Sequence, residues 1–295
     1  MPKIAVFGGS GYLASIIKNQ NNIKKNKFVF FSRKKIRNNY INILSNKKNL
    51  NILKNFDFLI HLVGPNQDQL KSNGKLIKKK KLITSKICDL CLTNNIKLIY
   101  ISSMQIYKDY GKKNITNYSK INFDNLYSKS HYESEKIILE KFSKHKKMFT
   151  ILRMGNVFGF KKINKLRDIQ NNLIHSFCLI ALKKRKIFIK NGSIQRTFIP
   201  SQIFMSIINL IIKKRLFNNS FENISYKNFN LKEISNLIQK RFELIFKKKI
   251  IVNIEKFYFK KKFNIHTSRY FKFTVNNKKI YFEIDRLFKN LKIGT

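Results

Sequence analysis

The chain has 295 residues and a formal net charge of +47 at pH 7, with 62 lysine and arginine residues against 15 acidic ones. No stretch approaches the roughly 18–20 consecutive apolar residues of a membrane-spanning helix. The chain has three cysteines, which are too few for a zinc site built from two C-x-x-C pairs. Lysine, asparagine, isoleucine and phenylalanine are abundant, and the lysines are spread through every segment, so we interpret the charge mainly as a compositional bias. A polyanion-binding role is the alternative.

The first feature along the chain is a glycine-rich turn. Residues 3–7 are apolar and strand-like, a helical spacing begins at Leu13, and three of the ten glycines fall at positions 8–11. Glycines between a strand and a helix are typical of a dinucleotide site, because they allow a tight turn and a close approach of the pyrophosphate to the helix N-terminus. The predicted cofactor contacts in this turn are Gly8, Ser10, Gly11, Tyr12 and Leu13.

Residues 27–32 are predicted to form a second buried strand. An acidic residue at the end of such a strand binds the adenosine ribose of NAD. This chain has Ser32 and Arg33 there instead, and both can bind a 2′-phosphate that a carboxylate would repel. The sequence therefore favours NADP over NAD.

A third strand is predicted over residues 56–64, ending at Gly64, which we also expect to contact the cofactor. His61 lies inside this strand, and we expect it to be packed rather than catalytic. A helix follows over residues 75–93, in which the lysine run 78–81 is interpreted as a solvated face. Cys88 and Cys91 are expected to be buried thiols of that helix, which fits a reducing cytoplasm.

A fourth strand is predicted over residues 96–103, and it ends in two hydroxyl side chains. Alternating strands and helices predict a doubly wound parallel sheet of the α/β class, whose ligands bind beyond the carboxyl ends of the strands. Ser103 should therefore face the same crevice as the glycine turn. The next helix carries Tyr132 and Lys136, which are four residues apart and share one helical face. Tyr258 and Lys262 have the same spacing, but they lie in a basic C-terminal segment.

Taken together, these segments resemble the extended short-chain dehydrogenase/reductases, the NAD(P)-dependent epimerase/dehydratase family of nucleotide-sugar enzymes. The matching segments, in the family's order, are G-G-S-G-Y-L-A at 8–14, D-F-L-I-H-L at 57–62, S-S-M-Q-I-Y at 102–107, L-R-M-G-N-V-F-G at 152–159 and R-T-F-I at 196–199. Met104 and Gln105 stand where the 4,6-dehydratases carry an Asp-Glu pair, so dehydration is disfavoured.

The resemblance implies a Rossmann domain over residues 1–160 and a smaller, mixed α/β substrate region over residues 161–295. It implies Tyr132 as general acid/base, Lys136 as the cation that lowers its pKa and binds the ribose, and Ser103 as the hydrogen-bond partner of the reacting oxygen. Asn156 and Arg196 would contact the nucleotide sugar.

The implied reaction is 4-keto reduction or C4 epimerisation, and the sequence does not separate the two. A homodimer is a further expectation from the resemblance. The alternative is a non-catalytic dinucleotide-sensing or polyanion-binding protein on the same fold.

Overall fold

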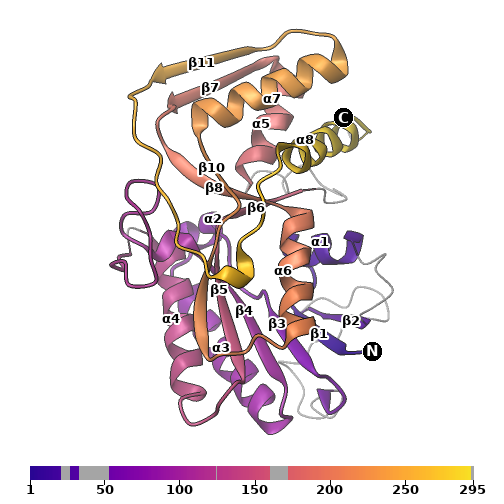
Figure 1. Ribbon diagram of the computed structural model, residues 1–295, viewed down its shortest axis with the longest axis vertical. Helices are drawn as coiled ribbons and strands as arrows, with labels where there is room; N and C mark the ends of the chain where they lie inside the picture. The colour runs from indigo at the N-terminus through magenta and orange to yellow at the C-terminus, as the bar shows by residue number, and fades with distance from the viewer. Residues whose placement is uncertain (21–26, 33–52, 124, 160–171, 294–295) are drawn as a thin grey trace. The chain divides into compact units, whose positions relative to one another are not determined.

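A computed structural model describes residues 1–20, 27–32, 53–123, 125–159 and 172–293. The chain divides into two compact units (Figure 1). The first comprises residues 1–108, 119–154 and 207–223, and the second comprises residues 109–118, 155–206 and 224–295. The chain therefore passes between the units at several points, whereas the sequence suggested one boundary after residue 160.

The first unit is built on a six-stranded sheet with the order β2-β1-β3-β4-β5-β9. Its strands are β1 (Lys3–Phe7), β2 (Lys27–Phe31), β3 (Phe58–His61), β4 (Lys97–Ser103), β5 (Phe149–Met154) and β9 (Ser220–Ile224). The pairs β1–β2, β1–β3, β3–β4 and β4–β5 are parallel. The predicted doubly wound parallel sheet is thus confirmed.

The central strands are apolar on both faces, as expected for a parallel sheet that helices cover on each side. Val6, Ile60 and Ile99 lie side by side in register across β1, β3 and β4, and all three are fully buried. Such short apolar runs form strands because β-branched side chains pack well on a pleated surface.

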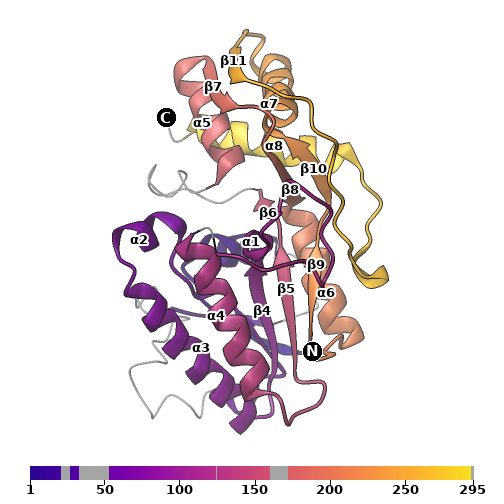
Figure 2. The same ribbon diagram turned by 90° about the vertical axis from the view of Figure 1, so that its left-hand side faces the viewer.

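The helices of the first unit cover the two faces of this sheet. They are α1 (Tyr12–Gln20), α2 (Gln67–Ser72), α3 (Leu76–Thr93), α4 (Leu126–Lys141) and most of α6 (Ser201–Lys214). Helices α3 and α4 lie side by side on one face, and α6 lies on the other (Figures 1 and 2). Asn125 caps α4 by accepting from the Ser128 backbone N–H at 2.9 Å. The predicted helix over residues 75–93 is α3, and Cys88 and Cys91 are buried free thiols in it as expected.

The second unit combines two small sheets with helices. Its elements are β6 (Asn156–Phe158), α5 (Leu173–Lys184), β7 (Lys186–Asn191), β8 (Gln195–Pro200), β10 (Lys227–Asn230), α7 (Leu231–Phe246), β11 (Ile251–Lys256) and α8 (Asn277–Ile293). Strands β10, β8 and β6 form one sheet, and β11 pairs with β7 in the other. Within the described residues, no helix is both long enough and apolar enough to cross a bilayer.

Candidate active site

The glycine turn joins β1 to α1 with a backbone that only glycine adopts easily. Gly8 has φ +92°, and a Cβ placed on it would lie 2.9 Å from the backbone carbon of Leu62. The N–H groups of Gly8 and Gly9 donate to the Phe31 carbonyl at 3.1 and 2.9 Å. Gly8 therefore serves the packing of β1 against β2 and the end of β3.

Gly11 has a different environment. A Cβ placed there would have one described neighbour within 4 Å, the Gly8 carbonyl oxygen at 3.1 Å. Ser10 and Gly11 are exposed, Tyr12 and Leu13 are half-buried, and α1 begins at Tyr12. Among the described residues, the turn thus presents open space and the first N–H groups of a helix on one side, which is what a diphosphate needs.

Two other predicted cofactor contacts follow the two strands that flank β1. Ser32 directly follows β2 and is 9% exposed, whereas Arg33 lies outside the described residues. Gly64 follows β3, and a Cβ on it would lie 3.3 Å from Cε of Lys80. Glycine at this position therefore leaves room for the lysine chain.

Ser103 ends β4, as predicted, and its partner is Tyr127. The Ser103 hydroxyl accepts from the Gln105 backbone N–H at 3.2 Å, and it lies close enough to the Tyr127 phenol to influence the pKa of that phenol. Burial raises the pKa of Tyr127, and the polar interaction with the Ser103 side chain opposes that rise. No pattern in the sequence singled out Tyr127. The structure places it in the first turn of α4, next to the end of β4.

Tyr132 and Lys136 occupy another face of α4. Five residues along a helix correspond to a rotation of about 140°, so Tyr132 points well away from the direction of Tyr127. Its ring packs against Phe123, with ring centroids 5.0 Å apart. Lys136 is half-exposed, and its Nζ lies 2.9 Å from Glu133, whose carboxylate raises the pKa of Lys136. The structure thus brings Tyr127, and not Tyr132, to Ser103.

The burial of Lys80 contradicts one of the sequence predictions. The lysine run 78–81 was expected to be a solvated face, and Lys78 and Lys79 are indeed exposed. Lys80 is instead 2% exposed, with its Nζ 3.3 Å from Ser130 Oγ. Burial lowers the pKa of Lys80 to about 7, although the Glu135 carboxylate acts in the opposite direction.

His61 is a packed histidine, as predicted. It is fully buried in β3, where the Val63 backbone N–H donates to Nδ1 at 3.2 Å and Nε2 lies 3.0 Å from Thr84 Oγ1. A ring that accepts at Nδ1 and donates at Nε2 is neutral. Burial, and secondarily the charge of Lys80, lower the pKa of His61 to about 3.

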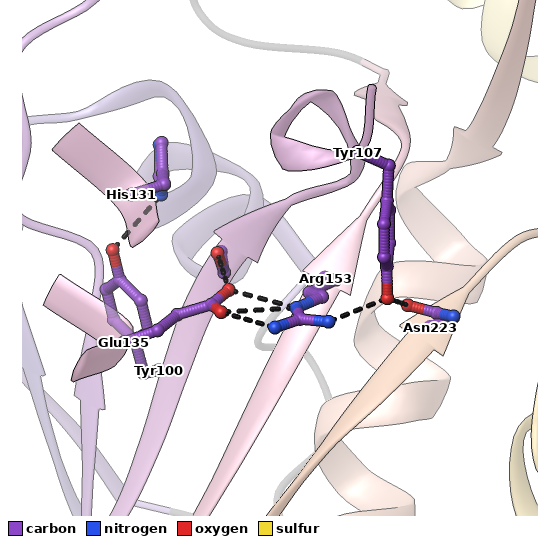
Figure 3. Close-up of polar contacts among 7 residues, drawn as sticks. Tyr100, Tyr107, His131, Glu135, Arg153 and Asn223 are labelled. Atoms are coloured by element: carbon purple, nitrogen blue, oxygen red, sulfur yellow. Dashed lines mark hydrogen bonds and ion pairs between the residues drawn. The ribbon is translucent and has the colours of Figure 1, made fainter. Parts of the chain in front are cut away.

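His131 lies one turn after Tyr127 on the same face of α4. Its ring centroid is 4.6 Å from that of Tyr127, and its Nδ1 is 3.1 Å from the Tyr100 phenol oxygen (Figure 3). Burial and the charge of Lys80 hold the pKa of His131 well below its usual range, so this ring is also neutral. His131 therefore brings no positive charge to Tyr127 at neutral pH.

A buried ion pair fixes α4 against the sheet. Arg153 in β5 donates to Glu135 in α4, with Nη2 2.6 Å from Oε2, and to the Tyr107 phenol oxygen at 2.7 Å (Figure 3). Ser102 donates to Glu135, and Tyr107 donates to the Asn223 side-chain oxygen at 2.9 Å. Arg153 and Glu135 are 2% and 1% exposed. This network links α4 to strands β4, β5 and β9 and so sets the position of Tyr127.

The two predicted substrate contacts belong to the second unit. Asn156 is the first residue of β6 and is in register with Phe198 of β8. Arg196 lies in β8, its Nη1 donates to the Gln195 carbonyl at 2.8 Å, and its guanidinium stands 5.4 Å from the ring centroid of Tyr110.

Comparison with known proteins gives a consistent picture. A model of the NAD dependent epimerase/dehydratase family matches residues 4–216. The chain is 27% identical over 237 residues to ADP-L-glycero-D-manno-heptose-6-epimerase of Brachyspira hyodysenteriae, a match that covers 71% of this chain and 72% of that protein.

Among solved structures, the chain is similar in fold to two sugar-nucleotide epimerases. One is the UDP-N-acetylglucosamine 4-epimerase of Methanobrevibacter ruminantium in complex with UDP-N-acetylmuramic acid, with a TM-score of 0.78, 18% identity and coverage of 100% of this chain and 99% of that chain. The other is the UDP-glucuronic acid 4-epimerase of Bacillus cereus in complex with UDP-glucuronic acid and NAD, with a TM-score of 0.77, 15% identity and coverage of 99% and 100%.

Proposed function

The chain belongs to the NAD dependent epimerase/dehydratase family, and from that premise we propose that it is an enzyme acting on a nucleotide-linked sugar. The reaction is 4-keto reduction or C4 epimerisation with a nicotinamide dinucleotide. The observation that carries this proposal is the hydroxyl pair of Ser103 and Tyr127. The pair stands at the carboxyl end of β4, and ligands of parallel α/β sheets bind at that end.

The residues of the glycine turn fit the cofactor. Gly11 leaves space for a phosphate beside the start of α1, and Gly8 keeps the turn tight against Leu62. The bound dinucleotide would accept or donate the hydride at the sugar carbon. The residues of this chain would bind its diphosphate, orient the sugar and move the accompanying proton.

Tyr127 is the residue that we propose for proton transfer, in place of Tyr132, which its spacing to Lys136, its position after β4 and the family resemblance suggested. Because burial raises the pKa of Tyr127, its phenol is protonated at neutral pH and can donate to a carbonyl oxygen that accepts a hydride on its carbon. The opposite direction, oxidation of an alcohol, needs the phenolate and therefore a nearby positive charge. Ser103 would hold the reacting oxygen.

Two matched variants test this assignment. Tyr127→Phe and Tyr132→Phe each remove only a hydroxyl from the same helix. UDP- and ADP-linked sugars and their 4-keto forms would be screened with NADH and NADPH. We expect Tyr127→Phe to lower kcat by about 10²–10⁴, the usual loss of general acid–base catalysis, and Tyr132→Phe to leave it unchanged. The reverse pattern would restore Tyr132 and Lys136 as the reacting pair.

A preference for NADP over NAD remains our proposal for the cofactor. Its support is the sequence after β2, where Ser32 and Arg33 replace a carboxylate; the similar Bacillus cereus structure was solved with NAD. Ser32→Asp combined with Arg33→Ala should shift the preference toward NADH, because each lost charge-assisted hydrogen bond is worth roughly 1.5–3 kcal/mol. Dissociation constants of NADPH and NADH for the wild type and the variant measure it, and a wild type that binds NADH more tightly contradicts it.

Epimerase and reductase differ in how long the cofactor stays bound. An epimerase needs its dinucleotide through both half-reactions, whereas a reductase releases it in each turnover. Dinucleotide that co-purifies with the protein therefore favours epimerisation. We also propose that Asn156 and Arg196 contact the sugar and its diphosphate, and that the enzyme is a cytoplasmic homodimer.

A further inference from the structure

Lys80 is the one buried lysine among those that the structure describes. Its Nζ is 3.3 Å from Ser130 Oγ, and its methylene groups lie against the backbone at Gly64. No ion pair among the described residues includes Lys80. Burying an ammonium without a contacting carboxylate costs considerable free energy, whereas methionine would fill similar space without that cost. A purely structural role therefore does not explain a lysine here.

The titratable groups that face Lys80 come from three elements packed around it. They are His61 of β3, Tyr100 of β4, and His131 and Glu135 of α4. Both histidines are neutral, and burial raises the pKa of Tyr100 well above its usual range. The Glu135 carboxylate is held by Arg153. The pKa of Lys80 is about 7, so this amine changes charge near neutral pH.

Lys80 is also connected to both halves of the proposed site. Ser130, its hydrogen-bond partner, donates to the Tyr127 carbonyl oxygen at 2.8 Å, and Lys80 acts electrostatically on His131, whose ring contacts Tyr127. On the other side, Lys80 lies against Gly64. The backbone just before Gly64 lies within 3.0 Å of the position that a Cβ would take on Gly8. Contacts therefore run from Lys80 through Ser130 to the backbone of Tyr127, and through Gly64 toward the segment that borders Gly8.

We propose that Lys80 on α3 supplies the positive charge of the reaction centre, the role that the sequence suggested for Lys136 on α4. Its ammonium favours the phenolate of Tyr127 electrostatically and exchanges no atoms with the substrate. When a sugar alcohol is oxidised, its proton passes to the Tyr127 oxygen and Lys80 keeps its own. Lys80 is therefore a positioning residue, and the proposal rests on the proposed function.

The proposal predicts that cofactor binding takes up a proton. A reduced dinucleotide brings the negative charge of its diphosphate without a charged nicotinamide ring. Negative charge near Lys80 stabilises its ammonium and raises its pKa from about 7. At pH 8 the free protein holds this amine mostly neutral, so the complex should gain a large fraction of a proton.

Calorimetric titration with NADH and with NADPH at pH 8, in buffers of different ionisation enthalpy, measures this uptake. The wild type and Lys79→Met, a control from the exposed face of α3, should take up about 0.4–0.8 of a proton if the pKa rises by one or two units. Lys80→Met should bind with little or no uptake. Far-UV circular dichroism shows whether each variant is folded.

A second measurement distinguishes a charge effect from a packing effect. In Lys80→Met, kcat for alcohol oxidation should fall at neutral pH and recover as the pH rises, because the phenolate then forms without the ammonium. Equal proton uptake in the wild type and Lys80→Met would overturn this inference while the proposed function stands. No binding of either dinucleotide to the wild type would overturn both.

Discussion

Replacing Lys80 should make the protein more stable, by an amount that depends on pH in a defined direction. The pKa of Lys80 is lowered from 10.5 to about 7 on folding. At about 1.36 kcal/mol per pKa unit, the buried ammonium costs the folded state up to about 5 kcal/mol. Relaxation and water penetration reduce this ceiling to a few kcal/mol in practice.

The sign follows from proton binding in the two states. Below pH 7 the amine is protonated in both states, so the whole cost is present. Between pH 7 and 10.5 the unfolded state binds more protons, so the contribution of Lys80 to stability improves as the pH rises and the cost disappears near pH 10.5. Lys80→Met should therefore gain most at pH 6, and the gain should shrink steadily between pH 7 and 10.

Urea unfolding at pH 6, 7, 8, 9 and 10 gives the free energy of unfolding for the wild type, Lys80→Met and Lys79→Met. Subtracting the Lys79→Met series removes the effect of one surface charge on the highly basic chain, because Lys79 is exposed on the same helix. A gain of the same size at pH 6 and pH 10 would show that packing, and not the buried charge, sets the difference. A loss of stability at pH 6 would refute the argument.

The remaining predictions concern the glycine turn and the buried ion pair. Gly11→Val should abolish dinucleotide binding while the protein stays folded, whereas Gly8→Ala should destabilise the fold itself because its Cβ would meet backbone at 2.9 Å. Dinucleotide titration and thermal unfolding distinguish them, and normal affinity in Gly11→Val would remove the cofactor from this turn. Glu135→Gln leaves the buried Arg153 without its counter-charge and should cost about 3–5 kcal/mol in urea unfolding. Asp89→Asn, which breaks a pair on the exposed side of the helices, should cost at most about 1 kcal/mol, and equal losses would contradict the reasoning.

Most of the fold could be predicted because its signals are local. The apolar runs of the central strands are short and bounded by polar residues, and the glycines mark where β1 ends and α1 begins. Helix α7 (Leu231–Phe246) begins and ends where its periodicity indicates, and Asn230 and Glu233 form a capping box at its start. The division into units was harder to foresee, because the chain returns to the first sheet through β9.

The site was harder to predict because spacing does not determine which face of a helix meets the sheet. Tyr132 and Lys136 have the expected spacing, but small side chains mark a different face of α4. Ser130 and Ser134 are buried there, and α3 and α4 pack closely along it. Tyr127 could have been found from this face, since it lies one turn before Ser130 and His131.

The burial of Lys80 was hard to predict for the same reason: a run of four lysines has no periodicity that shows which of them faces inward. The apolar residues farther along α3 contain the missing information. Ile83, Thr84 and Ile87 are buried, and Lys80 lies three, four and seven positions before them, the spacings that share one helical face. That phase places Lys80, and none of its three neighbours in the run, on the buried side.

The burial of Lys80 also separates it from the general basic character of the chain. An exposed lysine costs almost nothing, so a compositional bias can fill surface positions with lysine without affecting the fold. A fully buried lysine opposes folding, and its pKa of about 7 means that this opposition is present at physiological pH. A residue that destabilises the folded state can be retained when its charge serves the function of a site. The +47 charge is thus consistent with bias at the surface, while the one buried ammonium in the described part of the chain, beside Ser130, calls for a chemical reason.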